Sequence, residues 1–268
     1  MLPILNIALR AARQFNEYVN LTIDRKEHNA ADMTEDLKLV RHLEEVMFKT
    51  LMDALKKGYP THYVAETGEQ VSDDKEDVWF ILGFDNEQHL LRKLPETVYS
   101  FVHKKNGKLQ SAVIVNPFSG AEYIATKGRG AMFNDRRCRV GAQRNLEGAY
   151  FATDASNQFS SVSNPHVVSD LITEIGTAGI QTRVSNCPTL DLALVASGQL
   201  DAALLTSVNT KDLEAALLVC QEAGALVGDL KQGLLSSSTK SLVASNPKLF
   251  KATLQRFSNY GAKLSVDS

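Results

Sequence analysis

The sequence is poor in the features that mark disulfide-stapled or membrane-spanning proteins. Its three cysteines, Cys138, Cys187 and Cys220, lie far apart and form no C-x-x-C pair. An odd number at this spacing argues against a disulfide framework and against a structural zinc site. No apolar run is long enough to cross a bilayer, and the N-terminal segment lacks the cleavage site of a signal peptide. We therefore expect a cytoplasmic protein that needs no membrane partner.

An excess of charge of one sign is also missing. The formal net charge is -2, from 29 Lys and Arg against 31 Asp and Glu. This balance gives no strong signal for a nucleic-acid partner. Short basic clusters occur at 104–108 and 127–139, and such clusters are solvated surface far more often than binding sites.

The common catalytic motifs are absent as well. The six histidines form no H-x-x-x-H or H-E-x-x-H pair, and the chain has no G-x-S-x-G, Walker A or G-x-G-x-x-G motif. These absences argue against zinc proteases, nucleophile-elbow hydrolases, P-loop NTPases and dinucleotide-binding enzymes. A lone cysteine such as Cys187 is more often a small buried hydrophobe than a nucleophile.

Hydrophobic periodicity, by contrast, is clear. Apolar residues at helical spacing predict helices over about 2–22 and 34–58. Apolar strands and an Asn106-Gly107 turn predict an antiparallel sheet in the remainder of the first half. Further on, strand-like and helical segments alternate, which is typical of an α/β arrangement. We expect an α/β (α+β) protein with halves at 1–146 and 147–268 that form one compact unit.

Three carboxylates lie near the ends of predicted elements. Glu66 ends the strand HYVAE, Asp85 ends VWFILGFD, and Asp212 lies in the first turn of the helix TKDLEAALLVCQEAG. Carboxylates from separate elements could converge on Mg²⁺, which prefers oxygen ligands. The alternative is structural: Asp212 stabilises a helix N-terminus whatever else it does, and the other two can be solvated loop residues. Spacing alone favours the structural explanation.

Longer segments resemble a known family. They are MLPILNIALRAAR, KLPETVYSFVHKKNGKLQSAVIVNPFSGAEYIATKGRGAMFN, LDLALVASGQLDA and DLEAALLVCQEAGALVGDL. In these segments, and over nearly its whole length, the chain resembles the inositol monophosphatase family and especially its bacterial SuhB-like branch. The resemblance implies an αβαβα layered sandwich, a homodimer, and Mg²⁺ as the family's cofactor.

The resemblance also marks departures at the family's metal-binding strand. Family enzymes carry D-P-[IL]-D-G-T where this chain has LGFDNE. Leu82 stands at the first ligand Asp and Gly83 at the Pro. Asp85 matches the second Asp, and Asn86 replaces the Gly. Glu87 occupies the position of the Thr that orients the attacking water in the family.

The other positions of the family site are kept only in part. The upstream acidic motif aligns with AETGE, which makes Glu66 the retained ligand, with Glu69 as an alternative register. Asp212 matches the carboxylate of the family's W-D pair. Asn186 and Cys187 stand in the substrate loop where the family has G-S.

These departures lead to two main hypotheses. Leucine offers no lone pair, so the resemblance implies no Mg²⁺ or only weak Mg²⁺ binding. The first hypothesis is a catalytically impaired SuhB-like protein that binds protein partners, which in this branch include the transcription antitermination machinery. The second is a Mg²⁺-dependent phosphomonoesterase for inositol monophosphate or a related sugar phosphate, with Glu66, Asp85 and Asp212 holding one metal. A homodimer without other partners is a third.

Overall fold

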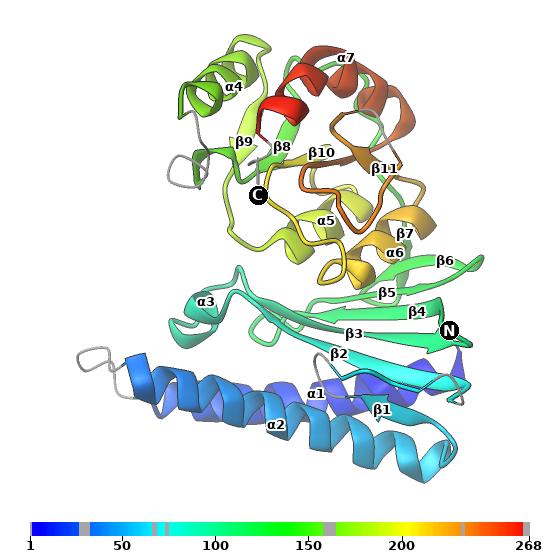
Figure 1. Ribbon diagram of the computed structural model, residues 1–268. Coiled ribbons are helices and arrows are strands. Elements are labelled where there is room, and N and C mark those ends of the chain that lie inside the picture. The colour runs from blue at the N-terminus through cyan, green and yellow to red at the C-terminus, as the bar shows by residue number, and fades with distance from the viewer. Residues whose placement is uncertain are drawn as a thin grey trace.

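The computed structural model describes residues 2–26, 33–65, 69–72, 75–157, 165–231 and 234–264. In this part of the chain, two sheets alternate with three layers of helices (Figure 1). The order is a helix pair, a seven-stranded sheet, a second helix pair, a five-stranded sheet and a third helix pair. This arrangement confirms the αβαβα sandwich that the family resemblance implies. Among the described residues, no helix combines the length and the apolarity needed to cross a bilayer.

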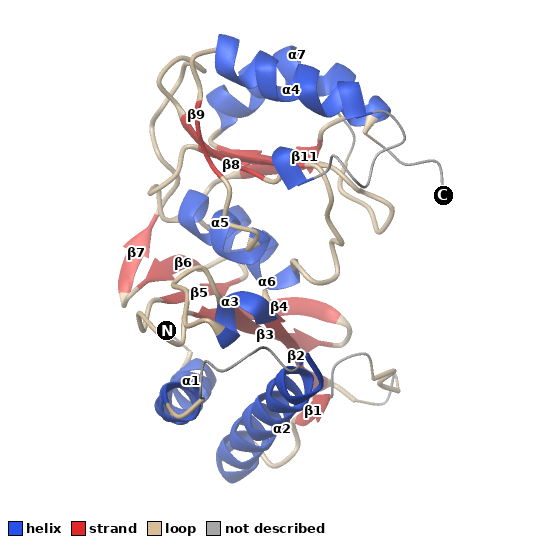
Figure 2. Ribbon diagram, turned by 90° about the vertical axis from the view of Figure 1, so that its left-hand side faces the viewer, coloured by secondary structure: helices blue, strands red, loops and turns tan. Residues whose placement is uncertain are grey.

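The first layer is a pair of long helices, α1 (Pro3–Asp24) and α2 (Met33–Gly58). Figure 2 shows both helices against the same face of the first sheet. Their buried residues recur every three or four positions, as expected for helices with one apolar face. These residues include Leu5, Ala8, Leu9, Ala12, Phe15 and Val19 of α1, and Val40, Leu43, Met47, Leu51 and Leu55 of α2. The predicted helices are therefore confirmed.

The first sheet has the strand order β1 to β7. Asn106 and Gly107 have φ values of 48° and 70° and form the predicted turn between β3 and β4. The prediction of an antiparallel sheet is wrong at one edge, because β1 pairs with β2 in parallel. The strands are β1 (Tyr63–Ala65), β2 (Asp77–Asp85), β3 (Val98–Lys105), β4 (Lys108–Val115), β5 (Glu122–Thr126), β6 (Gly130–Phe133) and β7 (Arg136–Cys138).

The second half alternates strands and helices around a sheet of order β11-β12-β10-β8-β9. Strand β8 is parallel to β9 and β10, whereas β12 is antiparallel to β10 and β11. The elements are β8 (Tyr150–Thr153), a 3-10 turn η1 (Ala155–Asn157), α4 (Pro165–Thr177), β9 (Gln181–Arg183), α5 (Pro188–Ala196), β10 (Ala202–Leu205), α6 (Glu214–Glu222), β11 (Leu226–Asp229), β12 (Leu242–Ser245) and α7 (Pro247–Lys263).

The middle layer of α5 and α6 joins the two sheets. One apolar cluster contains Ile114 of the first sheet, Leu192 of α5, Val219 of α6 and Leu242 of the second sheet. Burial of this shared surface stabilises both sheets together. That the halves 1–146 and 147–268 form one compact unit stays a prediction.

Strand β2 contains a β-bulge shortly before its end. Its ladder with β3 steps from the pair Ile81–Phe101 to the pair Gly83–Ser100, which leaves Leu82 as the extra residue. Gly83 has φ 74°, in the left-handed region that glycine adopts without steric cost. The bulge bends the strand immediately before Asp85, the residue that contacts the middle helix layer.

Candidate functional site

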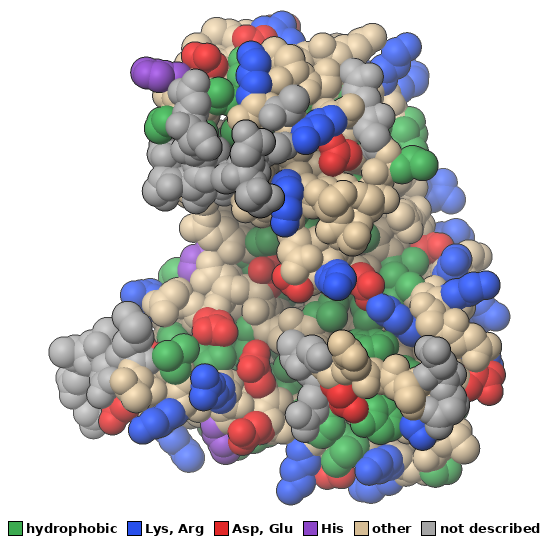
Figure 3. Space-filling model, in the orientation of Figure 1, with side chains coloured by type: hydrophobic (Ala, Val, Ile, Leu, Met, Phe, Trp, Pro, Cys, Tyr) green, Lys and Arg blue, Asp and Glu red, His purple; other side chains and the backbone are tan. Residues whose placement is uncertain are grey.

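A cavity of about 530 Å³ opens between the end of β2, the start of α5 and the segment that leads into α6. The described lining residues include Leu82, Asp85, Thr189, Asn209, Asp212 and Lys240. Over the face drawn in Figure 3, acidic and basic side chains of the described residues are interspersed, so neither sign dominates it. The cavity is the candidate site because two of the three predicted carboxylate ligands line it.

Asp85 is held at the N-terminus of α5. Its Oδ2 accepts a hydrogen bond of 2.6 Å from the backbone N–H of Thr189, and the Cys187 thiol lies 3.4 Å from the same oxygen. Burial raises the pKa of Asp85, and the hydrogen bonds from Thr189 and Cys187 oppose that rise. A carboxylate at a helix N-terminus satisfies a backbone donor and complements the helix dipole. Asp85 therefore has a structural role that needs no metal.

Asp212 also lines the cavity and is exposed. The prediction that it sits in the first turn of a helix is wrong, because α6 begins at Glu214 and Asp212 belongs to the turn before it. Its Oδ2 accepts a hydrogen bond of 2.8 Å from Asn209. The negative charge of Asp212 also contributes to the raised pKa of Asp85. The charge on one carboxylate is therefore felt by the other.

Among the described residues, the remaining predicted ligand positions add no third carboxylate to the cavity lining. Glu66 lies outside the described residues. The alternative, Glu69, is exposed and accepts a hydrogen bond of 2.5 Å from the Tyr63 hydroxyl. Glu69 is not among the described residues that line the cavity.

The bulge changes the backbone as well as the side chains at the family's motif. Leu82 lines the cavity and packs partly against the core. Proline is confined to φ near −65°, so it cannot adopt the backbone of Gly83 at φ 74°. The chain therefore follows a path here that a D-P-x-D sequence does not allow.

A carboxylate from α2 packs against this bulge. A Cβ added to Gly83 would lie only 2.9 Å from Oε1 of Glu44. Burial raises the pKa of Glu44, and the charge of Glu87 raises it further. Sequence reasoning missed Glu44, although its position three residues before the buried Met47 indicates that it borders the apolar face of the helix.

The predicted catalytic residue, Glu87, is the exposed first residue of the short helix α3 (Glu87–Leu91). It is not among the described residues that line the cavity. The preceding residue, Asn86, caps α3: its Oδ1 accepts from the N–H of His89, and its Nδ2 donates to the Asn186 carbonyl at 2.9 Å. This arrangement orients Asn86, rather than Glu87, toward the start of the middle helix layer.

Asn186 and Cys187 form the entry to α5. Asn186 has φ 56°, and its side chain accepts a hydrogen bond from Asn157. Cys187 is fully buried, and burial together with the charge of Asp85 raises the pKa of its thiol well above the usual value. A buried protonated thiol is a poor nucleophile. The two residues contact Asp85 and Asn86, so they hold the end of β2 against α5.

Asp154 holds a segment that borders the cavity and was missed by sequence reasoning. Its Oδ1 accepts from the backbone N–H and the hydroxyl of Thr206 at 2.6 and 2.7 Å, and its Oδ2 accepts from the N–H of Ser207 at 3.0 Å. Ser207 lines the cavity. The only sequence signal was its position as an acidic residue directly after the apolar strand AYFAT.

Asp191 provides a pH-dependent contribution to stability next to the site. It is 2% exposed and accepts hydrogen bonds from Ser185 and Arg183, and burial raises its pKa to about 6. Because the unfolded value is lower, native protein binds more protons than unfolded protein between roughly pH 4 and 6. The contribution of this carboxyl to the free energy of unfolding therefore falls as the pH rises through that window.

We expect the stability advantage of the wild type over Asp191→Asn to shrink by about 1–3 kcal/mol between pH 4 and pH 6.5, at about 1.4 kcal/mol per pKa unit. Urea unfolding at several pH values measures this difference. The exposed Asp53 gives a matched control as Asp53→Asn, whose profile should parallel the wild type. Parallel profiles for Asp191→Asn as well would contradict the assignment.

Comparison with known proteins identifies the family. The model of the inositol monophosphatase family matches residues 100–262. Nus factor SuhB of Pseudomonas aeruginosa is 34% identical over 262 residues, 95% of each chain, and the Nus factor SuhB of Escherichia coli is 27% identical over 256 residues, also 95% of each chain.

Among solved structures, the extragenic suppressor protein SuhB of Bartonella henselae has a TM-score of 0.75 at 23% identity, and the match covers 95% of this chain and 98% of that one. The Thermotoga maritima IMPase has a TM-score of 0.77 at 18% identity, over 97% and 99%. The chain therefore belongs to the inositol monophosphatase family.

Proposed function

We propose that this chain is a SuhB-like protein that acts by binding protein partners in the cytoplasm, and that its phosphatase site is catalytically impaired. One observation carries the proposal: at the family's metal-binding strand, Leu82 and the Gly83 bulge stand where the resemblance implies a ligand Asp and a Pro. The chemistry of the family needs Mg²⁺ to polarise phosphate and activate water.

The oxygen donors at the cavity fit such an ion poorly. Mg²⁺ demands near-ideal octahedral coordination by oxygen and gives up its water reluctantly. The Leu82 side chain supplies no oxygen, and Oδ2 of Asp85 already accepts a hydrogen bond from the N–H of Thr189. Lys240 also lines the cavity and adds a positive charge, which lowers the affinity for a cation. Lys211, which directly precedes Asp212 in the sequence, is not among the described lining residues.

The relatives support a transcription-related partner. The proteins from Pseudomonas aeruginosa and Escherichia coli are named Nus factors. We propose that this chain, as a homodimer, likewise joins the transcription antitermination machinery, with its layered scaffold serving as the binding surface.

A second candidate function is a residual phosphomonoesterase with one metal ion. It is favoured because Asp85 and Asp212 line the same cavity and because the charge of Asp212 raises the pKa of Asp85. In this alternative, Glu66 or Glu87 would complete the ligand set. Glu87 lies outside the described cavity lining, so a ligand role for Glu87 would require a rearrangement of α3.

Asp212→Asn separates the two functions. It removes a carboxylate that does not cap α5, so the fold should persist. We expect phosphate release from inositol 1-phosphate in excess Mg²⁺ to stay at background for both wild type and variant. We also expect both to bind the purified RNA polymerase–Nus complex of the source organism equally well, with or without a chelator. Asp53→Asn is the matched exposed control.

Two outcomes would contradict the proposal. Robust Mg²⁺-dependent turnover that Asp212→Asn abolishes would establish the phosphomonoesterase. Failure of the wild-type chain to bind the transcription complex would remove the proposed binding function.

A further inference from the structure

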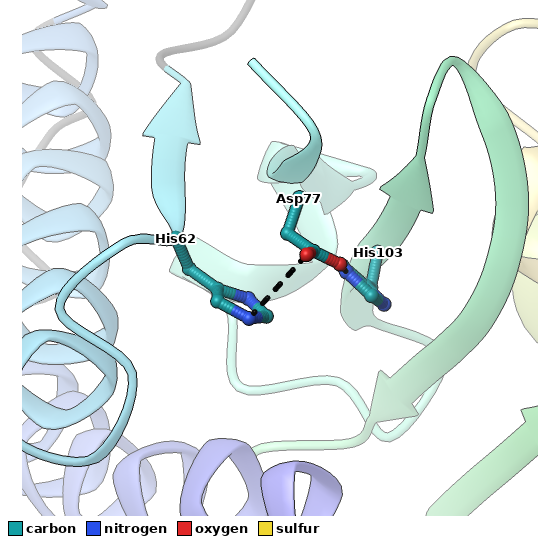
Figure 4. Close-up of side chains that lie close together, drawn as sticks. All are labelled: His62, Asp77 and His103. Carbon is teal, nitrogen blue, oxygen red and sulfur yellow. Dashed lines mark hydrogen bonds and ion pairs between the residues drawn. The ribbon is translucent and has the colours of Figure 1, made fainter.

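A second cluster of polar side chains lies at the other end of β2, far from the cavity. His62 precedes β1, Asp77 begins β2, and His103 lies near the end of β3 (Figure 4). Asp77 and Asp85 bound a nine-residue strand, so the cluster lies roughly 26 Å from the cavity at about 3.3 Å per residue. Neither the family's motif nor the proposed function uses these residues.

Strand register brings the three side chains together. Trp79 is paired with His103, and Asp77 lies two residues before Trp79, so the side chains of Asp77 and His103 point to the sheet face that packs on α1 and α2. His62 directly precedes Tyr63, which pairs with Val78, the neighbour of Asp77. Asp77 Oδ1 lies 2.8 Å from His103 Nε2, and Asp77 Oδ2 lies 3.9 Å from His62 Nε2. Figure 4 shows the carboxylate between the two imidazole rings.

We propose that His62, Asp77 and His103 bind a divalent transition-metal ion, Zn²⁺ being the ion that this donor set suits best. One ligand atom from each residue lies within 4.8 Å of the others. Bonds of about 2.0–2.2 Å to a tetrahedral ion place the ligand atoms roughly 3.3 Å apart. Side-chain rotations that move the ligand atoms by about 1 Å would therefore bring them to the distances that the ion needs. Two imidazoles and one carboxylate suit borderline ions rather than Mg²⁺ or Ca²⁺.

The surroundings hold the ligands in place. The His103 side chain is 9% exposed and that of His62 is 10% exposed. The His62 ring stacks on His103 at 5.4 Å, and Trp79 stacks on His103 at 5.1 Å. Burial lowers the pKa of both histidines, which favours the neutral imidazole that a metal requires. Three protein ligands leave a fourth position for water or another ligand, as in accessible zinc sites.

Binding would change the environment of Trp79. Its indole N–H lies 3.3 Å from Nδ1 of His62, which places the proton of the neutral ring on Nε2, facing Asp77. Coordination through Nε2 moves the ring proton to Nδ1, so Trp79 loses its acceptor. Because Trp79 is the single tryptophan of the chain, its fluorescence reports on this event directly.

Lys105 competes with a metal for the same carboxylate. Its Nζ lies 3.9 Å from Asp77 Oδ2 and 2.9 Å from Glu76 Oε1. Removal of this positive charge in Lys105→Met should therefore tighten metal binding several-fold without removing a ligand. Tighter metal binding by this variant is expected if the cluster is a metal site, and is not expected if the cluster exists only for ion pairing.

The test is a titration of the whole chain with Zn²⁺ and with Co²⁺, followed by Trp79 fluorescence, calorimetry and Co²⁺ absorption. We expect saturable binding of one ion per chain at micromolar concentration, Co²⁺ quenching of Trp79, and reversal by a chelator. His62→Gln and His103→Gln should each weaken binding at least tenfold, whereas His42→Gln and Asp212→Asn should leave it unchanged. Circular dichroism establishes that each variant is folded.

The inference is overturned if the wild type shows no saturable binding up to millimolar metal. It is equally overturned if folded His62→Gln binds as tightly as the wild type. Neither outcome bears on the proposed function, because Asp212→Asn and the transcription complex test that separately.

Discussion

Trp79→Ala is expected to lower the free energy of unfolding by about 3–5 kcal/mol, the usual cost of truncating a large core aromatic. Trp79 has no exposed surface and lies in the cluster that joins α1 and α2 to the first sheet. Its ring packs on Phe101 at 6.1 Å and on His103 at 5.1 Å. Removing it leaves a cavity between two rigid layers that cannot collapse without moving both.

Urea unfolding followed by circular dichroism measures this loss, since the variant has no tryptophan. Trp79→Phe keeps most of the volume and should lose about 1–2 kcal/mol. Tyr150 is 41% exposed, so Tyr150→Ala is a matched surface control with a loss of about 0.5 kcal/mol. A loss below about 1 kcal/mol for Trp79→Ala would show that the helix layer does not depend on this side chain.

Asp154→Ala is the second large effect, with an expected loss of about 2–4 kcal/mol. The Asp154 carboxylate accepts three hydrogen bonds, two of them from the backbone N–H groups of Thr206 and Ser207. Alanine leaves those two donors without their acceptor just after the end of β10. We also expect faster hydrogen exchange at both amides and a change in the cavity wall that Ser207 forms.

Asp201 gives a matched control for Asp154. Its Oδ2 accepts a single backbone hydrogen bond of 2.9 Å, from Tyr150 at the opposite end of β8. Asp201→Ala should therefore lose about 1 kcal/mol and leave exchange at Thr206 unchanged. Equal losses in the two variants would mean that the number of hydrogen bonds does not set the cost, and would refute the role given to Asp154.

Local patterns predicted much of the fold. The apolar faces of α1 and α2 and the turn at Asn106-Gly107 depend on neighbours within a few residues, which the sequence displays directly. The parallel pairing of β1 with β2 was not predictable, because three residues carry no signal for strand direction. Helix α3 was missed for a similar reason, since five residues are too short for a helical period to show.

The candidate site was predictable only in part. Asp85 and Asp212 were expected to converge, and they line one cavity. Their predicted roles as ligands stay predictions, as do those of Glu66, Glu87, Asn186 and Cys187. Asp154, Glu44 and Lys240 reach the site from distant segments, and nothing in their immediate neighbours distinguishes them from other polar residues.

The amino-acid sequence alone established the family, most of the order of helices and strands, and the absence of a side-chain oxygen at Leu82, because each depends on residue identity or short-range periodicity. Folding in three dimensions decided that Asp85 caps α5, that Gly83 forms a bulge, and that His62, Asp77 and His103 meet. These outcomes depend on strand register and layer packing, which join residues as far as 104 positions apart. The arrangement of the polar side chains at either end of β2 therefore follows from how that strand is paired and bent.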